Sequence, residues 1–353
     1  MPNTCIKPTR NQSMDCYKMI ASILVVFLHV NFPEKFDGYV QCFAKFAIPV
    51  FFAISGYFNY GADQHSLTRR LKHLLRLYLI IIIANLIWGC FVTEYNSGST
   101  IAFLRTYFPE PEEFATWLFL QMPPRSGHLW YLSAACVAYV ILRAYVRFFG
   151  KKPIDYRPLY VISFCMFAFY FTFGAIGPII GVDFPFQLYR NGYLWALPMF
   201  TLGIFIHEHQ EQILNNYHLT PRKQVLLFFV GAVLGIFQWK TVGMNQITFG
   251  ALLDIIILMT FLASHPRITS HPGVGETLIS KFGAWSTWIY LLHIIMREFY
   301  QIFCHQPLAI ALPAWEPWLR PIAVAGLSFL VAVLFEQGER LFNQFRKQKI
   351  RSH

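Results

Sequence analysis

Long apolar stretches alternate with short polar segments along the whole chain. A helix that spans a bilayer needs about 20 mostly apolar residues, and this rule gives ten expected spans. They cover residues 14–32, 39–58, 74–92, 128–146, 159–181, 192–206, 223–239, 247–264, 285–303 and 318–335. The apolar stretches are continuous, which predicts helices rather than the alternating strands of a β-barrel. We therefore expect an all-α, polytopic membrane protein with about ten transmembrane helices in one bundle.

The composition excludes other classes of protein. Of the 353 residues, 56% are hydrophobic and only 13% are charged, against about 25% charged residues in typical soluble domains. The net charge of +11 could indicate nucleic-acid binding, but no basic-aromatic motif lies outside the apolar stretches. The seven cysteines form no CxxC pair, so we expect no metal site and no disulfide framework.

The distribution of Lys and Arg predicts the orientation. Far more of these residues lie between spans on the side of the N-terminus than on the other side, so the positive-inside rule places both termini in the cytoplasm. The acidic segment 93–127 is then a long extracytoplasmic loop, and 336–353 is a basic cytoplasmic tail. Residues 1–353 form a single membrane domain, and we expect it in the cell inner membrane.

The first span carries three ionisable side chains, which are costly in hydrocarbon and are therefore candidates for function. Lys18 and His29 are eleven residues apart, so they share one helix face and are separated by about 16 Å. Asp15 lies one turn before Lys18. The structural alternative is a snorkelling Lys18 paired with Asp15, and a His29 that is hydrogen-bonded within the bundle.

The second span and the segment that follows it contain two further signals. Pro49 and Gly56 predict either a broken helix that lines a cavity or a simple kink. Arg69, Arg70, Lys72 and Arg76 then place four cations within eight residues. They are explained equally well by membrane anchoring and by a pocket for a phosphorylated cofactor.

Later spans hold isolated polar residues with open interpretations. Tyr290, His293 and Arg297 share a helix face, and His293 is a candidate for either function or helix packing. Asp254 is a lone acid that needs a partner, for which Arg143 and Lys45 are the candidates. The tract His207-Glu208-His209 is expected to be a solvated cytoplasmic turn.

Together these residues resemble the acyltransferase-3 family of bacterial inner-membrane O-acyltransferases. The resemblance covers nearly the whole chain. It rests on the opening helix Asn11 to His29, on Phe51-Phe-Ala-Ile-Ser55-Gly56-Tyr57-Phe58, on the basic run through Arg76, on His128-Leu-Trp130-Tyr131-Leu132, on the stretch from Tyr189-Arg190-Asn191 to Gly203, on Tyr290-Leu-Leu-His293 and on Glu336. The first spans are also similar to the membrane portion of serine/alanine racemases of glycopeptide resistance.

The resemblance implies transfer of an acyl group from cytoplasmic acyl-CoA, expected to be acetyl-CoA, to a hydroxyl of an extracytoplasmic glycan. His29 is then the general base, because a neutral imidazole suits proton removal near neutral pH. The same resemblance implies that Asp15 and Lys18 order the entrance to the site, and that Arg69, Arg70, Lys72 and Arg76 bind the phosphates of CoA. Ser55 or Tyr57 would stabilise the oxyanion. Substrate or structural roles are expected for Trp130, Arg190, His293 and Glu336. The expected partners are acyl-CoA, the glycan acceptor and membrane lipid, without metal or nucleic acid.

Two alternatives stay open at this point. The same buried charges suit a transporter of a small polar solute such as an amino acid. For an acyltransferase, the residues are compatible with direct transfer and with an acyl-enzyme intermediate.

Overall fold

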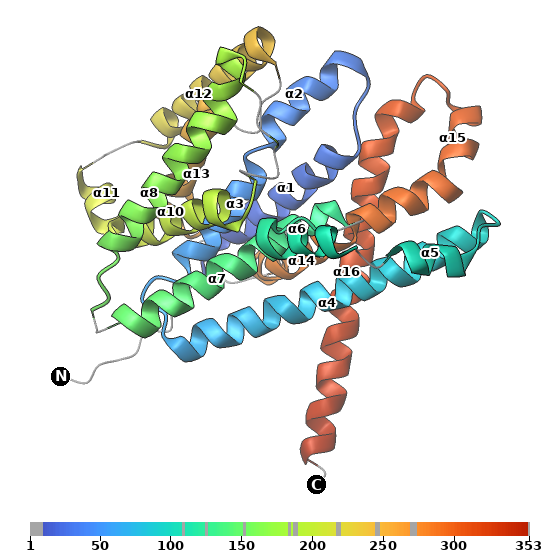
Figure 1. Cartoon of the computed structure of the whole chain (residues 1–353), viewed down its shortest axis with the longest axis horizontal. Coiled ribbons are helices and arrows are strands. Elements are labelled where there is room, and N and C mark those ends of the chain that lie inside the picture. The colour runs from blue at the N-terminus through green and yellow to red at the C-terminus, as the bar shows by residue number, and fades with distance from the viewer. Residues whose placement is uncertain are drawn as a thin grey trace.

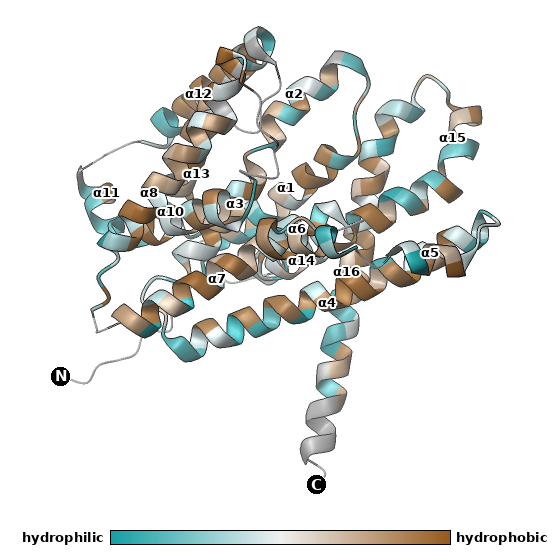
Figure 2. Cartoon of the chain, viewed as in Figure 1, coloured by the Kyte–Doolittle hydropathy of each residue, from teal (hydrophilic) through white to brown (hydrophobic). Residues whose placement is uncertain are grey.

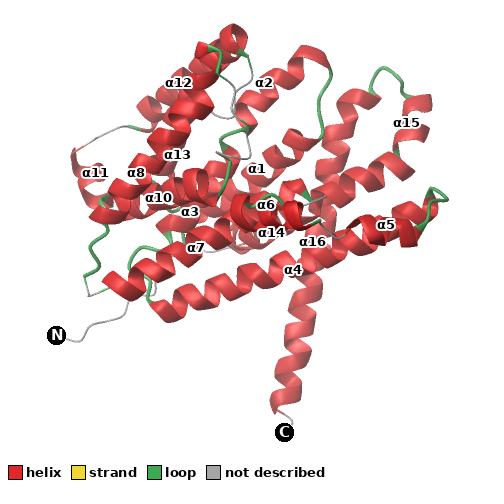
Figure 3. Cartoon of the chain, viewed as in Figure 1, coloured by secondary structure: helices red, strands yellow, loops and turns green. Residues whose placement is uncertain are grey.

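The structure is a computed structural model that describes residues 10–107, 110–123, 126–150, 153–182, 185, 190–216, 220–243, 248–268 and 274–351. These residues fold into helices joined by loops, and no strand occurs among them (Figure 3). The all-α prediction is therefore confirmed.

The helices follow one another along the chain with short connections (Figure 1). They are α1 (Gln12–His29), α2 (Glu34–Ala44), α3 (Ala47–Tyr57), α4 (Gln64–Tyr95), α5 (Thr100–Tyr107), α6 (Pro111–Leu120), η1 (Gly127–Leu129), α7 (Trp130–Phe149), α8 (Arg157–Phe171), η2 (Thr172–Ile176), η3 (Gly177–Ile180), η4 (Gly192–Ala196), α10 (Leu197–Glu208), α11 (Gln210–Asn216), α12 (Pro221–Val242), α13 (Phe249–Ser264), α14 (Val274–Phe303), α15 (His305–Ala311) and α16 (Glu316–Arg351).

Six stretches in the described part of the chain are long and apolar enough to cross a membrane. They are Phe36–Tyr57, Gln64–Tyr95, Gly127–Phe149, Arg157–Gly174, Pro221–Thr241 and Glu316–Phe342. The helix α13 is apolar but shorter. The chain is thus a multi-pass membrane protein, while the number of ten spans and the orientation of the termini stay predictions.

Hydrophobic residues are frequent along most helices of the bundle (Figure 2), and many of them are exposed. Phe164 of α8 is 72% exposed and Phe229 of α12 is 60% exposed. Such large apolar side chains are stable on the surface when lipid rather than water surrounds them. The surface therefore fits a protein that is embedded in a bilayer.

The expected span 39–58 is broken in the structure. Helix α2 ends at Ala44 and α3 begins at Ala47, so Pro49 lies in the first turn of α3. Proline has no N–H to donate to residue 45, and its ring clashes with the carbonyl of that residue. The break therefore falls one turn before Pro49, and Lys45 and Phe46 connect the two halves.

The structure adds helices to two of the expected connecting segments. The segment 93–127, expected as a loop, contains the end of α4 and the helices α5 and α6. Glu110 and Glu113 form a capping box at the start of α6, and Pro111 occupies a first-turn position, which together favour a helix there. The tail after residue 336 continues α16 to Arg351 and extends away from the bundle (Figure 1).

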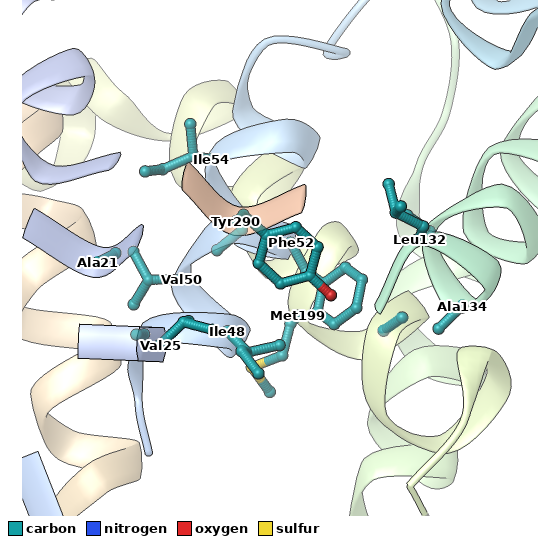
Figure 4. Close-up of a cluster of buried hydrophobic side chains, with 14 of the residues drawn as sticks. Ala21, Val25, Ile48, Val50, Phe52, Ile54, Leu132, Ala134, Met199 and Tyr290 are labelled. Carbon is teal, nitrogen blue, oxygen red and sulfur yellow. The ribbon is translucent and has the colours of Figure 1, made fainter. Parts of the chain in front are cut away.

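The core lies where α1, α3, α7, α10 and α14 meet. Ala21 and Val25 of α1 and Val50 of α3 are fully buried and lie close together, with Tyr290 of α14 near Phe52 (Figure 4). The most extensive helix pairings are α1 with α14, α3 with α10, α14 with α16 and α12 with α13. These contacts hold α1 at the centre of the bundle.

Glycine makes the packing of α3 against α10 unusually close. A Cβ atom on Gly203 would lie 1.8 Å from the backbone oxygen of Ala53, and one on Gly56 would lie 1.7 Å from the oxygen of Phe200. Only glycine allows two helix backbones to approach this far. The position of α3, which carries residues of both cavities described below, therefore depends on these glycines.

Candidate functional site

The site begins with His29, the last residue of α1. Its ring centroid lies 5.0 Å from that of His293 on α14, and the centroid of His128 lies 5.5 Å from that of His293. We call His29, His128 and His293 the histidine cluster. The pairing of α1 with α14 thus brings together residues that are more than 260 positions apart in the chain.

His293 has a defined tautomer in this arrangement. Its Nδ1 lies 2.6 Å from the backbone oxygen of Tyr290, and a carbonyl only accepts hydrogen bonds, so Nδ1 is assigned as the protonated nitrogen. In the neutral ring Nε2 is then an acceptor. The side chain is fully buried, and within the described part of the chain its Nε2 and that of His128 have no hydrogen-bond partner. Such unsatisfied buried atoms are costly and are typical of functional sites.

His29 opens onto a cavity of about 210 Å³, the histidine cavity. Its lining residues are Leu28, His29, Gln41, Lys45, Ile48, Pro49, Trp130, Tyr170, Arg190 and Trp195. The guanidinium carbon of Arg190 lies 4.5 Å from the centroid of the Trp130 ring. Asn191, the next residue, caps η4 by accepting hydrogen bonds from the backbone N–H groups of Tyr193 and Leu194, which fixes the chain beside Arg190.

A second cavity, of about 750 Å³, lies along the first half of α4, and we call it the basic cavity. Its lining residues are Ser55, His65, Thr68, Arg69, Arg70, Lys72, His73, Leu74, Arg76, Tyr131, Ala135 and Tyr139. Residues 69, 72, 73 and 76 are three or four apart and therefore share one face of the helix. The volume is in the range of about 300–1,000 Å³ that is usual for ligand pockets.

The four predicted cations of this cavity differ in their contacts. Arg70 donates hydrogen bonds of 2.6 Å to the backbone oxygen of Phe58 and to Oδ1 of Asn59, so it ties α4 to the turn after α3. Among the described residues, Arg69, Lys72 and Arg76 have no hydrogen bond or ion pair. These three cations are available to an anionic ligand, whereas Arg70 has a structural role.

Neighbouring aromatic residues link the two cavities. Trp130 lines the histidine cavity and the next residue, Tyr131, lines the basic cavity. The Tyr131 ring packs against Phe52 with centroids 4.6 Å apart and against Tyr290 at 5.2 Å. Tyr290 in turn donates a hydrogen bond of 2.6 Å to the backbone oxygen of His128. The aromatic layer of Phe52, Trp130, Tyr131 and Tyr290 therefore connects the basic cavity to the histidine cluster.

Asp15 and Lys18 do not lie with His29. The Lys18 ammonium is 3.3 Å from Oδ1 of Asp15 and 5.2 Å from the centroid of Phe58, and Arg10 also pairs with Asp15. This cluster is at the first turns of α1, about 16 Å along the helix from His29. It is near the turn that Arg70 holds, so its position is consistent with the entrance role and does not support contact with the reacting hydroxyl.

Tyr57 also lies away from both cavities. Its hydroxyl donates a hydrogen bond of 2.6 Å to Gln210, and its ring packs on His207 with centroids 4.5 Å apart. Ser55 and Tyr57 are two residues apart on α3, about 200° around the helix, so only Ser55 faces the basic cavity. This position gives no support to the expected role of Tyr57 at an oxyanion.

Two other expectations need correction. His207, expected to be solvated, donates a hydrogen bond of 2.8 Å from its Nδ1 to the backbone oxygen of Tyr57 and stacks on Tyr60. Asp254 pairs with neither of its expected partners: its Oδ1 is buried without a hydrogen-bond partner among the described residues and faces Gly231 of α12.

The remaining predicted residues have clear positions. Glu336 is buried in α16 and forms an ion pair with Arg340 one turn later, a helix-surface contact away from both cavities. Trp130, Arg190 and His293 are all at the histidine cavity or cluster. His128 is a functional candidate that the sequence analysis did not single out. The signal for it was its place as the first residue of the expected fourth span, 128–146.

The arrangement is that of an integral membrane enzyme with an imidazole at one cavity and free cations at another. In the described part of the chain, no three His, Cys, Asp or Glu side chains are grouped as metal ligands. The family model of the acyltransferase-3 domain, described as an acyltransferase domain, matches residues 11–337. The chain belongs to this family and is an enzyme that transfers acyl groups, which favours the acyltransferase hypothesis over the transporter hypothesis. Comparisons with curated proteins and with solved structures give no match.

Proposed function

We propose that this acyltransferase moves an acetyl group from cytoplasmic acetyl-CoA to a hydroxyl of an extracytoplasmic glycan in the cell inner membrane. The observation that carries the proposal is the pair of cavities that the aromatic layer connects. Three cations that have no partner among the described residues line one of them, and His29 lines the other. A charged donor and a polar acceptor can thus approach one reaction centre from two sides.

In this proposal the basic cavity holds the phosphates of CoA. Phosphate oxygens form strong hydrogen bonds with Arg and Lys, and the guanidinium of Arg binds two oxygens at once. Arg69, Lys72 and Arg76 supply these donors from one face of α4. The thioester arm, which carries no charge, extends from there toward Tyr131 and the aromatic layer.

His29 acts as the general base of the reaction. It removes the proton of the acceptor hydroxyl while the hydroxyl oxygen attacks the thioester carbonyl carbon. The new ester C–O bond forms, the C–S bond breaks, and the thiolate of CoA receives the proton from His29. Tyr131 and Ser55 both line the basic cavity. In this proposal the Tyr131 hydroxyl donates a hydrogen bond to the carbonyl oxygen as negative charge develops on it.

The test measures acyl transfer in inverted membrane vesicles, whose cytoplasmic face is outside. Vesicles receive acetyl-CoA labelled in the acetyl group, and the label in the glycan fraction and the free CoA thiol are both quantified. General-base catalysis contributes about 10²–10⁴ in rate, so His29→Gln should lower transfer by at least 100-fold with normal membrane insertion.

The matched control is His209→Gln. The His209 ring is at the surface end of α10, where Nδ1 bonds to the oxygen of Phe205 in its own helix, and we expect transfer within about twofold of the unchanged protein. Transfer by His29→Gln at the level of this control would contradict the proposal. Mass spectrometry of envelope glycans from cells with and without the protein then identifies the acceptor.

A further inference from the structure

His293 lies at the centre of the histidine cluster with one ring nitrogen bonded and the other without a partner. Its Nδ1 donates a hydrogen bond of 2.6 Å to the backbone oxygen of Tyr290, and the side chain is fully buried. Among the described residues nothing bonds to its Nε2. Because Nδ1 carries the proton, Nε2 presents a lone pair that can only accept. A buried acceptor without a donor is costly, so this position needs a donor.

The ring of His29 is the nearest donor that the packing of α1 on α14 provides. The two ring centroids are 5.0 Å apart, close to the separation of about 5 Å expected when a hydrogen bond of about 3 Å joins two imidazole rings. The ring planes are tilted by 39°. His29 is the last residue of α1 and is half-buried beside the histidine cavity. A rotation of its ring therefore brings an N–H onto Nε2 of His293 without moving a helix.

His128 is the other imidazole beside His293. Its ring centroid is farther away, at 5.5 Å, and the two rings are nearly perpendicular, at 83°. Its backbone oxygen accepts the hydrogen bond from the Tyr290 hydroxyl, which holds His128 against α14. The ring of His29 is thus the closer and more nearly parallel of the two neighbours, and it is also the one that lines the cavity.

A general base needs a partner for the nitrogen that does not react. A neutral imidazole has two tautomers, and the hydrogen bond at one nitrogen decides which nitrogen is free. In the common catalytic triads a third group, usually an acid, accepts the N–H of the base. None of the described residues that line the histidine cavity is acidic. The lone pair of His293, whose own tautomer is fixed by the Tyr290 carbonyl, has the chemistry of that third group.

We infer that His293 is a positioning residue that accepts a hydrogen bond from His29 and so keeps the other ring nitrogen of His29 free for the acceptor hydroxyl. When His29 takes the hydroxyl proton it becomes an imidazolium, and its hydrogen bond to His293 becomes charge-assisted and stronger. No proton passes to His293, and the proton taken by His29 goes to the thiolate of CoA as described above. The inference rests on the proposed function for the role of His29, and it adds the residue that orients this base.

Two substitutions separate the two nitrogens of His293. The amide nitrogen of Asn can replace Nδ1 and keep the hydrogen bond to Tyr290, but Asn has no atom that reaches the position of Nε2. The longer Gln can place its amide oxygen, an acceptor, near that position. In the inverted-vesicle assay, His293→Asn should lower kcat at least about tenfold with KM for acetyl-CoA within about twofold. His293→Gln should keep kcat within about threefold of the unchanged protein.

The matched control is His265→Asn. The Nδ1 of His265 also lies near a backbone oxygen, that of Phe261 at 3.1 Å, and its ring stacks on the Phe261 ring. His265 therefore has a local contact like that of His293, but it lies outside the histidine cluster. We expect kcat of this variant within about twofold of the unchanged protein.

The tautomer of His29 gives a second measurement that does not depend on acyl transfer. Solid-state ¹⁵N NMR of protein with labelled histidine in liposomes distinguishes protonated from free ring nitrogens, and a difference spectrum against His29→Gln assigns the signals of His29. We expect one tautomer of His29 in the unchanged protein and in His293→Gln, and a mixture of both tautomers in His293→Asn. A residue that only packs against His29 would not change this ratio.

The outcomes decide between positioning and packing. An unchanged kcat in His293→Asn, an equal loss of kcat in His293→Asn and His293→Gln, or the same His29 tautomers in His293→Asn and the unchanged protein would each overturn the inference. Normal transfer by His29→Gln would instead overturn the proposed function. The two proposals therefore fail separately.

Discussion

Removing the charges of Lys72 and Arg76 tests whether the basic cavity holds the phosphates of the acyl donor. Both side chains line the cavity and have no partner among the described residues, so Lys72→Gln and Arg76→Gln break no protein contact. Hydrogen bonds to charged groups contribute about 1.5–3 kcal/mol, while exposed ion pairs contribute about 0.2–1 kcal/mol. Both residues are exposed, and we expect about 1 kcal/mol for each.

This free energy corresponds to roughly a fivefold increase of KM for acetyl-CoA in each single variant and roughly 30-fold in the double variant. The value of kcat should change by less than twofold, because these groups bind the donor equally before and during the reaction. The assay is initial-rate transfer in inverted vesicles at several acetyl-CoA concentrations. A parallel series with 3′-dephospho-acetyl-CoA reports whether the lost contact was to a phosphate.

The matched control is Arg157→Gln. Arg157 is an exposed cation whose partner is Asp155, with Nε 2.9 Å from Oδ1, and it lies outside the basic cavity. The Arg157 guanidinium also lowers the pKa of Asp155, mainly through the side-chain hydrogen bond. An unchanged KM for acetyl-CoA in the Lys72→Gln, Arg76→Gln double variant would refute the reasoning and assign these cations to membrane anchoring.

Three further predictions follow from the packing. His293→Asn should lower kcat about tenfold or more, because the imidazole beside His29 is lost. It should not lower thermal stability in detergent, because the Asn side chain can keep the hydrogen bond to the backbone oxygen of Tyr290. An unchanged kcat would show that His293 does not take part in the site. Gly203→Ala should destabilise the protein by about 1–3 kcal/mol, measured as a lower apparent Tm, whereas Gly326→Ala, which has open space around its Cβ position, should not. Tyr57→Phe should leave transfer within about twofold, and a loss of 100-fold would restore its role at the oxyanion.

The helices were predictable from the sequence where apolar residues form long continuous stretches. Helices that depend on local signals such as capping, rather than on apolar stretches, were not predictable in this way. The helix α6 has only 10 residues and begins with the capping box of Glu110 and Glu113, a local signal that a search for spans does not register. The continuation of α16 beyond residue 336 lies outside the expected spans, because its apolar residues Leu341, Phe342, Phe345 and Ile350 are too few for a helix that crosses a membrane.

The candidate site was predictable within single helices and not between them. The face shared by Arg69, Lys72 and Arg76 follows from helix periodicity alone. The contact of His29 with His293 depends on how α1 packs against α14, which sequence spacing does not determine. The same limit applies to Asp254, because its position opposite Gly231 results from the packing of α12 on α13.

The central claim is that donor and acceptor enter cavities on opposite sides of the membrane. It is tested by the sidedness of two cysteine substitutions, Lys72→Cys in the basic cavity and Gln41→Cys in the histidine cavity, in a protein whose seven native cysteines are replaced by serine. A membrane-impermeant maleimide should label position 72 only in inverted vesicles and position 41 only in right-side-out vesicles. Labelling of both positions from the same side would contradict the account.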